Sequence, residues 1–430
     1  MRDARKTALT VLSRCERDGG YSNLVLDREL EKSELSALDR ALTAHLVFGV
    51  ISRRITLDYY ILKLSAVASS KIEPQVKNIL RMGLYQLIYM DRIPPHAAVD
   101  RSVSLAPRRA AGFVNALLRG YMRRSGEIAL PDDPVEKMSV EQSMPIELCE
   151  RLIAEYGYDR AESIFAALNK TPPLTLRVNT VKTTRDGLIA RFAEKGIEAR
   201  PSSLSENGIE VNAAVTTLPG FAEGEFFVQD AASQLCCSAL GLDEGDLFLD
   251  CCSAPGSKSF GAAMHMSGRG RIVSCDLHEN KLSLIRSSAE RLGIGIIETR
   301  AADARQPIDE FVRKCDAVLC DVPCSGYGVI AKKPEIRFKP LSDAERLPEI
   351  QYAILENAAR YVKDGGVLVY STCTLLSAEN GEIASRFAKS HPEFTPEGFS
   401  HAGREFSPQT QLLPDSDGCD GFFIAKFRKG

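Results

Sequence analysis

Apolar residues recur every three or four positions through the first 125 residues, which is the spacing of one buried helix face. The run Leu42, Leu46, Val47 and Val50 is one example. Pairs of helix breakers, Gly19-Gly20 and Pro94-Pro95, interrupt the pattern. The sequence therefore predicts an all-helical domain over residues 1–130.

A second pattern follows a candidate linker at residues 125–134. Helical spacing returns over residues 135–171, and residues 174–179 then alternate between apolar and polar side chains, as a half-buried strand does. A helical pattern through 188–192 and a strand-like 208–211 come next. We expect a helical linker and a small α+β module over residues 131–222.

From about residue 226 strand and helix patterns take turns. Strand patterns cover residues 247–252, 271–276, 295–299, 317–321, 366–372 and 422–427, and helix patterns cover 258–266, 279–292, 344–362 and 378–390. Such alternation is typical of an α/β fold with a doubly wound, mostly parallel, Rossmann-like sheet, here over residues 223–430. Ligands of these sheets bind at the carboxyl ends of the strands. Polar and thiol residues at those predicted ends are Asp250, Cys252, Asp276, Asp321, Cys324 and Cys373.

Composition places the chain among globular proteins of two or three domains. Of its 430 residues, 44% are hydrophobic and 26% are charged. The sequence has no apolar run of the roughly 18 residues that a membrane helix needs, and we expect no secretory signal. Twelve cysteines without a CxxC pair are expected to be reduced thiols in a cytoplasmic protein.

The net charge of −3 hides an uneven distribution. Residues 1–125 hold 21 Lys and Arg against 12 Asp and Glu, and residues 101–125 hold no acid at all. The arginines of that stretch are Arg101, Arg108, Arg109, Arg119, Arg123 and Arg124. This asymmetry indicates a module that neutralises phosphates, although a solvated helix face would produce the same arginine stretch.

A loop of small residues, CSAPGSKS at 252–259, joins a predicted strand to a predicted helix. It is no phosphate loop, because that motif requires Gly and Lys to be adjacent and here Ser257 separates them. Backbone N–H groups at the helix start still suit an anionic group, and a methionine-like carboxylate fits as well as a phosphate. The predicted cofactor contacts in this loop are Cys252, Ser253, Ala254, Pro255, Gly256, Ser257 and Lys258.

Two acids follow neighbouring strand patterns. Asp276 is placed to accept hydrogen bonds from ribose hydroxyls, and Asp303 to bind an adenine amino group. Either acid alone is more typical of a solvated loop, but their joint placement favours adenosine. Because the loop is not a phosphate loop, we expect a nucleoside ligand that lacks phosphates, which describes S-adenosylmethionine.

Three motifs now carry a family resemblance. Residues 250–259, 321–326 (DVPCSG) and 371–374 (STCT) resemble the signature motifs of Sun-type RNA cytosine-C5 methyltransferases, with flanking similarity at 227–233 and 420–426. Residues 5–9 through 113–119 resemble a NusB-like RNA-binding domain. That fusion is similar to the bacterial 16S rRNA (Sun/Fmu, RsmB-type) branch of the family, and the resemblance covers essentially the whole chain.

The resemblance implies a role for each motif residue. Cytosine C5 is a weak nucleophile, and adding a thiolate at C6 makes it enamine-like. The family correspondence assigns that thiolate to Cys373 and removal of the C5 proton to Cys324. Asp321 is implied at the N3 side of the base and beside the cofactor. No metal is expected, since Cys320 and Cys324 are four residues apart but no second ligand pair follows.

Alternative functions stay open at this point. A DNA cytosine methyltransferase shares the Pro-Cys motif but would use that cysteine as the nucleophile, so Cys373 separates the two classes. Another RNA, either tRNA or 23S rRNA, is possible as the substrate. A non-catalytic NusB-like RNA-binding factor would need neither cysteine. We expect a monomer that acts on ribosomal RNA and binds no membrane.

Overall fold

The computed structural model describes residues 3–18 and 21–430, so the predicted break at Gly19-Gly20 lies outside the described residues. The chain forms two compact units. The first contains Met1–Asn169 and Lys332–Lys339, and the second contains Lys170–Ala331 and Pro340–Gly430. The domain boundaries expected near residues 130 and 222 remain predictions.

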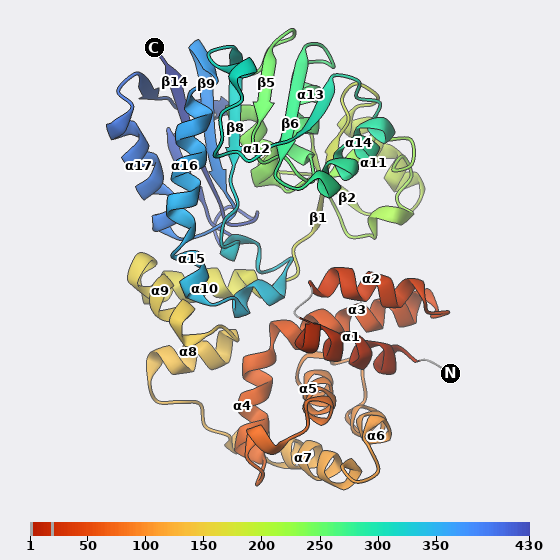
Figure 1. The fold of residues 1–430 in the computed structure, drawn as a ribbon. Coiled ribbons are helices and arrows are strands. Elements are labelled where there is room, and N and C mark those ends of the chain that lie inside the picture. Colours follow the sequence, from red (N-terminus) through yellow and green to blue (C-terminus); the bar gives the residue numbers. More distant parts are fainter. Residues whose placement is uncertain (1–2, 19–20) are drawn as a thin grey trace. The chain divides into compact units, whose positions relative to one another are not determined.

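The first unit is built from helices (Figure 1). They are α1 (Ala4–Asp18), α2 (Ser22–Glu31), α3 (Ala37–Ser52), α4 (Arg54–Leu64), α5 (Pro74–Tyr89), α6 (Pro95–Leu105), α7 (Ala111–Arg124), α8 (Pro134–Gln142), α9 (Ile146–Tyr156) and α10 (Tyr158–Leu168). Proline opens α5, α6 and α8, a position where its missing N–H costs nothing. The apolar stripe predicted from the sequence forms the core, where Leu46, Leu80 and Leu118 are fully buried. No helix in the described part of the chain is both long and apolar enough to cross a bilayer.

A short segment from late in the chain completes this unit. Lys332–Lys339 contains the 3₁₀ helix η6 (Pro334–Phe338). Its Arg337 side chain is 1% exposed and donates to the backbone oxygens of Ser52 at 2.5 Å and Ser143 at 3.0 Å. The Phe338 ring lies 3.5 Å from the guanidinium carbon of Arg54. The segment is therefore part of the helical core.

The second unit begins with a small antiparallel sheet. Its strands are β1 (Leu174–Val178), β2 (Ala199–Pro201), β3 (Gly208–Val211) and β4 (Phe226–Val228), in the order β2-β3-β1-β4. Helix α11 (Arg185–Glu194) packs Leu188 and Phe192 into the same core as Leu176 and Ile209. Strand β4 lies inside the range 223–430 but pairs with β1 of the small sheet.

A larger sheet follows. Strands β5 (Leu247–Asp250), β6 (Arg271–Asp276), β7 (Ile297–Ala301), β8 (Cys315–Asp321) and β9 (Val362–Thr372) are parallel, and β10 (Phe394–Pro396), β13 (Gln409–Leu412) and β14 (Phe422–Lys429) add antiparallel strands. The order is β10-β14-β9-β8-β5-β6-β7, and β13 also pairs with β14. A separate two-stranded sheet joins β11 (Phe399–His401) to β12 (Arg404–Phe406). The chain leaves β5 toward β6 and β7 and later returns on its other side as β8 and β9, so a topological switch point lies between β5 and β8.

Helices cover both faces of the large sheet (Figure 1). Leu249 packs with α16 (Leu347–Ala359) and α17 (Gly381–Ser390), whereas its neighbour Phe248 packs with α12 (Ala231–Ala239) and α13 (Ser257–His265). Helix α14 (Glu279–Leu292) packs beside β6 and β7, and the short α15 (Leu341–Ala344) precedes α16. The α/β, doubly wound Rossmann-like class preceded by an all-helical domain is confirmed.

Most of the predicted ranges shift at one or both ends, and three of these shifts have a clear structural reason. The strand expected at 295–299 is β7, Ile297–Ala301, because it pairs from Ile272↔Ile297 to Asp276↔Ala301 at the edge of the parallel sheet. The helix expected at 344–362 ends at Ala359, since Val362 already pairs with Cys315 as the first residue of β9. The helix expected at 378–390 starts at Gly381, after a 3₁₀ turn η7 (Ser377–Glu379).

Candidate active site

The predicted site residues gather at one edge of the large sheet. Strands β5, β6 and β8 end at Asp250, Asp276 and Asp321, and Cys373 directly follows β9. Parallel pairing sets Asp250 beside Leu319 of β8 and Asp321 beside Ser371 of β9. The strand ends at the β5/β8 switch point are therefore adjacent, which is where such sheets bind ligands.

Two turns bring the motif cysteines together. The Sγ atoms of Cys324 and Cys373 are 3.2 Å apart, and the Cys373 N–H donates to Cys324 Sγ at 3.3 Å. Both side chains are partly exposed and neither forms a disulfide. Gly328 holds the turns close: its N–H donates to Cys373 O at 3.0 Å, and a Cβ there would lie 1.9 Å from Gly421 O. The 321–326, 371–374 and 420–426 motifs therefore meet in space.

The cysteine pair divides its charge unequally. A hydrogen bond from the Cys324 thiol lowers the pKa of Cys373 against burial and the Asp321 carboxylate, which both raise it, and Lys258 adds to the lowering. The same hydrogen bond, burial and the Glu379 carboxylate hold the pKa of Cys324 well above the usual thiol value. The Cys373 N–H acts on Cys324 in the opposite direction, but its effect is smaller than those of the thiol hydrogen bond, burial and the Glu379 charge. The negative charge of the pair therefore belongs on Cys373.

Asp321 lies in a polar contact set at the end of β8. Its Oδ2 is 2.6 Å from Lys258 Nζ, and its Oδ1 accepts from Ser371 Oγ at 2.8 Å. Burial alone would lower the pKa of Lys258, but the Asp321 carboxylate overrides burial and raises it, so the lysine stays cationic. The Lys258 ammonium therefore pairs with Asp321, although the sequence placed it in the cofactor loop only.

The sequence motifs missed a buried carboxylate behind the cysteines. Glu379 is 1% exposed and accepts from Ser325 N–H at 2.9 Å, and Gln351 Nε2 donates to the same oxygen at 2.8 Å. Its position, five residues after the STCT motif in a stretch predicted as helix, gave only a weak signal. The partners come from the Pro-Cys turn and from α16, which no local pattern connects.

The loop predicted to hold the cofactor is shaped by its small residues. Ser253 donates to Cys275 O through both its N–H at 2.7 Å and its Oγ at 3.0 Å, which ties the loop to β6. Gly256 has φ +103°, and a Cβ there would lie 2.6 Å from the Phe260 ring. Helix α13 begins directly afterwards at Ser257, so its first N–H groups have no partner within the helix. This cradle is suited to an anionic group.

The two predicted adenosine-binding acids differ in their surroundings. Asp276 is 8% exposed at the end of β6, and its Oδ1 accepts from His278 N–H at 2.9 Å. Arg305 donates three hydrogen bonds to the Asp303 carboxylate, two from its guanidinium at 2.9 and 2.6 Å and one from its backbone N–H at 3.0 Å. Near the loop, Asp250 Oδ1 is buried without a partner among the described residues. A small-residue cradle beside a strand-end acid fits a phosphate-free nucleoside, so the residues present suit S-adenosylmethionine.

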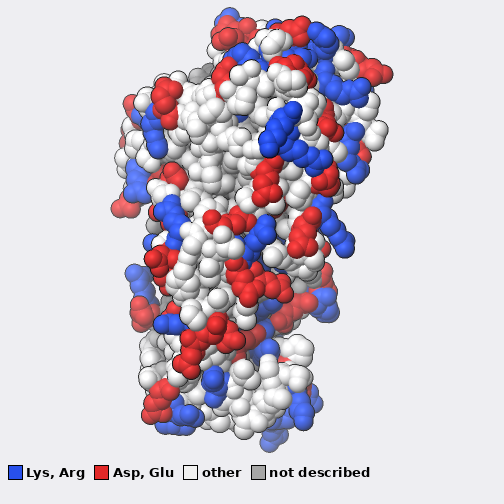
Figure 2. Space-filling view, turned by 90° about the vertical axis from the view of Figure 1, so that its left-hand side faces the viewer, with Lys and Arg blue, Asp and Glu red and all other residues white. Residues whose placement is uncertain are grey.

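The arginines of residues 101–125 are exposed in the helical unit. Arg109 pairs with Glu73 at 2.9 Å and Arg124 with Glu127 at 3.6 Å, whereas no carboxylate of the described residues lies within 4 Å of Arg108 or Arg123. On the face drawn in Figure 2, acidic and basic side chains are interspersed. Arg108 and Arg123, like Arg101 and Arg119 of the same stretch, therefore have no carboxylate partner among the described residues and can meet phosphates.

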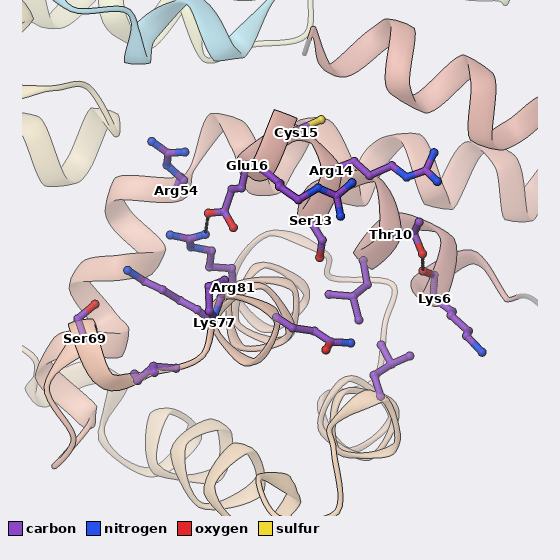
Figure 3. A pocket seen from close by; sticks show the side chains of 16 residues that line it. Lys6, Thr10, Ser13, Arg14, Cys15, Glu16, Arg54, Ser69, Lys77 and Arg81 are labelled. Carbon is purple, nitrogen blue, oxygen red and sulfur yellow. Dashed lines mark hydrogen bonds and ion pairs between the residues drawn. The ribbon is translucent and has the colours of Figure 1, made fainter. Parts of the chain in front are cut away.

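A cavity of about 1110 Å³ also opens in the helical unit (Figure 3). Its basic lining residues are Lys6, Arg14, Arg17, Arg54, Lys77 and Arg81. Most are neutralised nearby: Arg81, for example, contacts Glu16 at 2.5 Å and Asp58 at 2.7 Å. The cavity therefore carries less positive charge than its lining suggests.

Family models match three parts of the chain. Residues 237–428 match 16S rRNA methyltransferase RsmB/F, residues 2–123 match the NusB family, and residues 144–217 match the ferredoxin-like domain of RsmF/B-like methyltransferases. These ranges cover the large sheet, the first seven helices and most of the small antiparallel sheet.

Similar proteins and solved structures agree with these matches. The chain is 38% identical to the probable ribosomal RNA small subunit methyltransferase B of Bacillus subtilis, over 99% of this chain and 98% of that protein. It is 35% identical to the Synechocystis protein of the same description, over the full length of both. A methyltransferase homolog protein from Pyrococcus horikoshii has a TM-score of 0.61 at 27% identity, over 70% of this chain and all of that chain. NSun6 from the same organism, solved with SFG, has a TM-score of 0.59 at 21% identity, over 70% of this chain and 98% of that one, and shows the fold alone. Full-length identity above 30% settles the family, and the chain belongs to the S-adenosylmethionine-dependent ribosomal RNA small subunit methyltransferase B family.

Proposed function

We propose that this enzyme methylates C5 of a cytosine in 16S rRNA through a covalent adduct with Cys373. The observation that carries the proposal is the 3.2 Å pair of Cys324 and Cys373, in which the lowered pKa of Cys373 favours its thiolate. The names of the full-length relatives support a small-subunit ribosomal RNA substrate.

The first step is addition to the base. The Cys373 thiolate forms a bond to C6, and the electrons of the C5=C6 double bond move toward N3 and O2 of the ring. Asp321 lies at the N3 side, and its Lys258 partner at 2.6 Å supplies positive charge and an exchangeable proton there as negative charge develops. C5 becomes enamine-like and nucleophilic.

The second step is methyl uptake and release. S-adenosylmethionine supplies, when bound, the methyl group that C5 takes up. The Cys373 sulfur is then a neutral thioether, so no thiolate next to Cys324 favours the protonated form of Cys324. Cys324 can then lose its proton to solvent. The backbone N–H of Cys373, which is 3.3 Å from Cys324 Sγ, stabilises the Cys324 thiolate. Cys324 removes the C5 proton, C5=C6 re-forms, and the electrons of the C6–S bond return to Cys373.

The substrate must present an accessible base. Proteins that act on bases in structured nucleic acid turn the target base out of its stack, and sequence-specific RNA recognition favours unstacked nucleotides. Asp276 and the residues 252–258 are proposed to hold the cofactor at the neighbouring strand ends, with Asp303 at the adenine. Asp321 would face both the base and the cofactor.

The test is methyl transfer with labelled S-adenosylmethionine and 16S rRNA, 23S rRNA, tRNA and DNA in parallel. We expect label in 5-methylcytidine of 16S rRNA, and bisulfite sequencing of rRNA from a deletion strain should lose one cytosine signal. Label in another RNA would identify that RNA as the substrate instead of 16S rRNA. Label in DNA would show that the protein is a DNA cytosine methyltransferase. RNA binding without any methyl transfer would indicate that the protein is a non-catalytic RNA-binding factor.

A further inference from the structure

Glu379 is a buried carboxylate that every contact treats as an acceptor. Its Oε2 accepts from Ser325 N–H at 2.9 Å and from Gln351 Nε2 at 2.8 Å, and its Oε1 accepts from Thr374 Oγ1 at 3.3 Å. No basic nitrogen of the described residues lies within 4 Å of it. Three donors and, in the described part of the chain, no acceptor face the carboxylate, which suits its ionised form, and a buried charge without a cation is costly enough to require a reason.

The donors come from the two turns that carry the cysteines. Ser325 directly follows Cys324, and Thr374 directly follows Cys373. The hydroxyls of Ser325 and Thr374 are 2.6 Å apart, and Gln351 Nε2 also donates to Pro323 O at 3.0 Å. One carboxylate therefore fixes the backbone on both sides of Cys324 and the residue after Cys373.

The negative charge of Glu379 also affects which of the two cysteines is ionised. A negative group beside a thiol disfavours the thiolate of that thiol. The Glu379 carboxylate raises the pKa of Cys324. Around Cys373, the carboxylates of Asp321 and Asp420 raise the pKa and Lys258 lowers it, but the hydrogen bond from Cys324 outweighs them and the pKa is lowered. The carboxylate thus opposes negative charge on Cys324 and leaves it to Cys373.

We propose that Glu379 is a positioning residue that holds the two cysteine turns together and keeps the shared proton of the pair on Cys324. The inference rests on the proposed function, in which Cys373 must attack as a thiolate while Cys324 waits as a thiol. A carboxylate that served packing alone would hold the turns together without affecting which cysteine is ionised.

The matched variants are Glu379→Gln and Glu382→Gln. In Glu379→Gln the amide oxygen still accepts from Ser325 and Gln351, and the amide nitrogen can donate to Thr374 Oγ1, so the turns stay connected without the charge. Glu382 is exposed on α17 and contacts Ser377 Oγ, which makes Glu382→Gln a control for a lost glutamate charge. Thr374→Val removes one hydrogen bond and keeps the carboxylate.

The measurements are methyl-transfer kinetics and the order of iodoacetamide alkylation, read by mass spectrometry of the two cysteine peptides. In the unchanged protein Cys373 should be alkylated first. Glu379→Gln should lower both kcat and the Cys373-to-Cys324 alkylation ratio about tenfold at unchanged KM for RNA, because the charge that opposes a Cys324 thiolate is gone. Thr374→Val should lower kcat and keep the ratio, and Glu382→Gln should change neither.

Two results would overturn the inference: faster alkylation of Cys324 in the unchanged protein, or a Glu379→Gln enzyme with unchanged kcat and ratio. If Glu379→Gln fails to fold, the alkylation order of the unchanged protein and the kcat of Thr374→Val decide, and full activity of Thr374→Val would reject the positioning role. Failure of the proposed function looks different, because the unchanged protein would then make no 5-methylcytidine.

Discussion

Cys324 and Cys373 are chemically alike and 3.2 Å apart, yet their pKa values move in opposite directions. This asymmetry predicts opposite phenotypes. Cys373→Ala should lose methyl transfer and form no covalent RNA adduct. Cys324→Ala should add to the base, take up the methyl group and then stall, so that a slow-migrating band persists on a denaturing gel with target RNA.

The reverse pattern would exchange the two roles. A band that survives in Cys373→Ala and disappears in Cys324→Ala would make the Pro-Cys cysteine the nucleophile, as in the DNA enzymes. Cys149→Ala is a suitable control, because that thiol is fully buried in the helical unit and donates to Met144 O at 3.9 Å. It should change neither band nor activity.

The pH dependence of Cys373 follows from the same hydrogen bond. The thiolate is the reactive form, and the Cys324 thiol lowers the pKa of Cys373, so reactivity should persist to lower pH than for an ordinary cysteine. Removing that donor in Cys324→Ala should raise the pKa. The rate of Cys373 alkylation against pH should then shift to the alkaline side, and an unshifted profile would mean that Cys324 does not stabilise the thiolate.

Asp276 and Asp303 are predicted to bind one cofactor, but their contacts predict unequal losses. Asp276 keeps hydrogen-bonding capacity at a strand end, and a hydrogen bond to a charged group contributes about 1.5–3 kcal/mol. Asp276→Ala should therefore weaken S-adenosylmethionine binding about tenfold or more in calorimetric titration. Asp303→Ala should weaken it less, since Arg305 already occupies that carboxylate. Wild-type affinity in Asp276→Ala would remove this residue from the cofactor site.

Sequence motifs identified the residues whose chemistry is local to a strand end. Asp321, Cys324 and Cys373 each follow an apolar strand pattern, and parallel pairing brings such ends together. The motifs did not predict the partners of these residues. Lys258 contacts Asp321 across 63 positions, and Glu379 contacts Ser325 across 54. Those distances in sequence are closed only by sheet order and turn geometry.

At the scale of elements, periodicity predicted most of the large sheet because its strands are buried on both faces. The range of β6, Arg271–Asp276, and that of α14, Glu279–Leu292, were predicted to the residue. The bounds of elements at the edge of the sheet were harder to predict. The apolar run 294–297 suggested a strand at 295–299, but Gly293 closes α14 and Ile294 N–H still bonds Ala289 O, which delays β7 to Ile297.

The segment Lys332–Lys339 leads to a prediction about stability. Arg337 is buried in the helical unit with carbonyl partners Ser52 and Ser143 from different helices and loops. Removing it leaves these oxygens without a donor, so Arg337→Met should destabilise this unit by about 2–4 kcal/mol. Lys339→Met, on an exposed side chain of the same segment, should leave the unfolding midpoint in urea unchanged. Equal midpoints for both variants would show that the segment is not anchored by Arg337.

For the whole molecule, the expected monomer remains a prediction, and charge asymmetry remains the main sequence signal for RNA binding. The cationic excess of residues 1–125 is partly cancelled within the helical unit by ion pairs such as Arg81 with Asp58. The number of these charges can be read from the sequence, but the ion pairs they form cannot. The pairing decides which arginines are free to release counterions from RNA.

The last prediction uses that pairing. If phosphates bind the arginine stretch, Arg108→Ala with Arg123→Ala should weaken RNA binding and reduce the slope of log affinity against log salt by about 1.4–1.8, from two lost phosphate contacts. Arg109→Ala with Arg124→Ala should reduce it less, because Glu73 and Glu127 already neutralise those arginines. S-adenosylmethionine affinity should stay the same in both variants. An unchanged salt slope in the Arg108/Arg123 variant would indicate that RNA binds to the second unit. Equal losses in both double variants would mean that the ion pairs of Arg109 and Arg124 open when RNA binds.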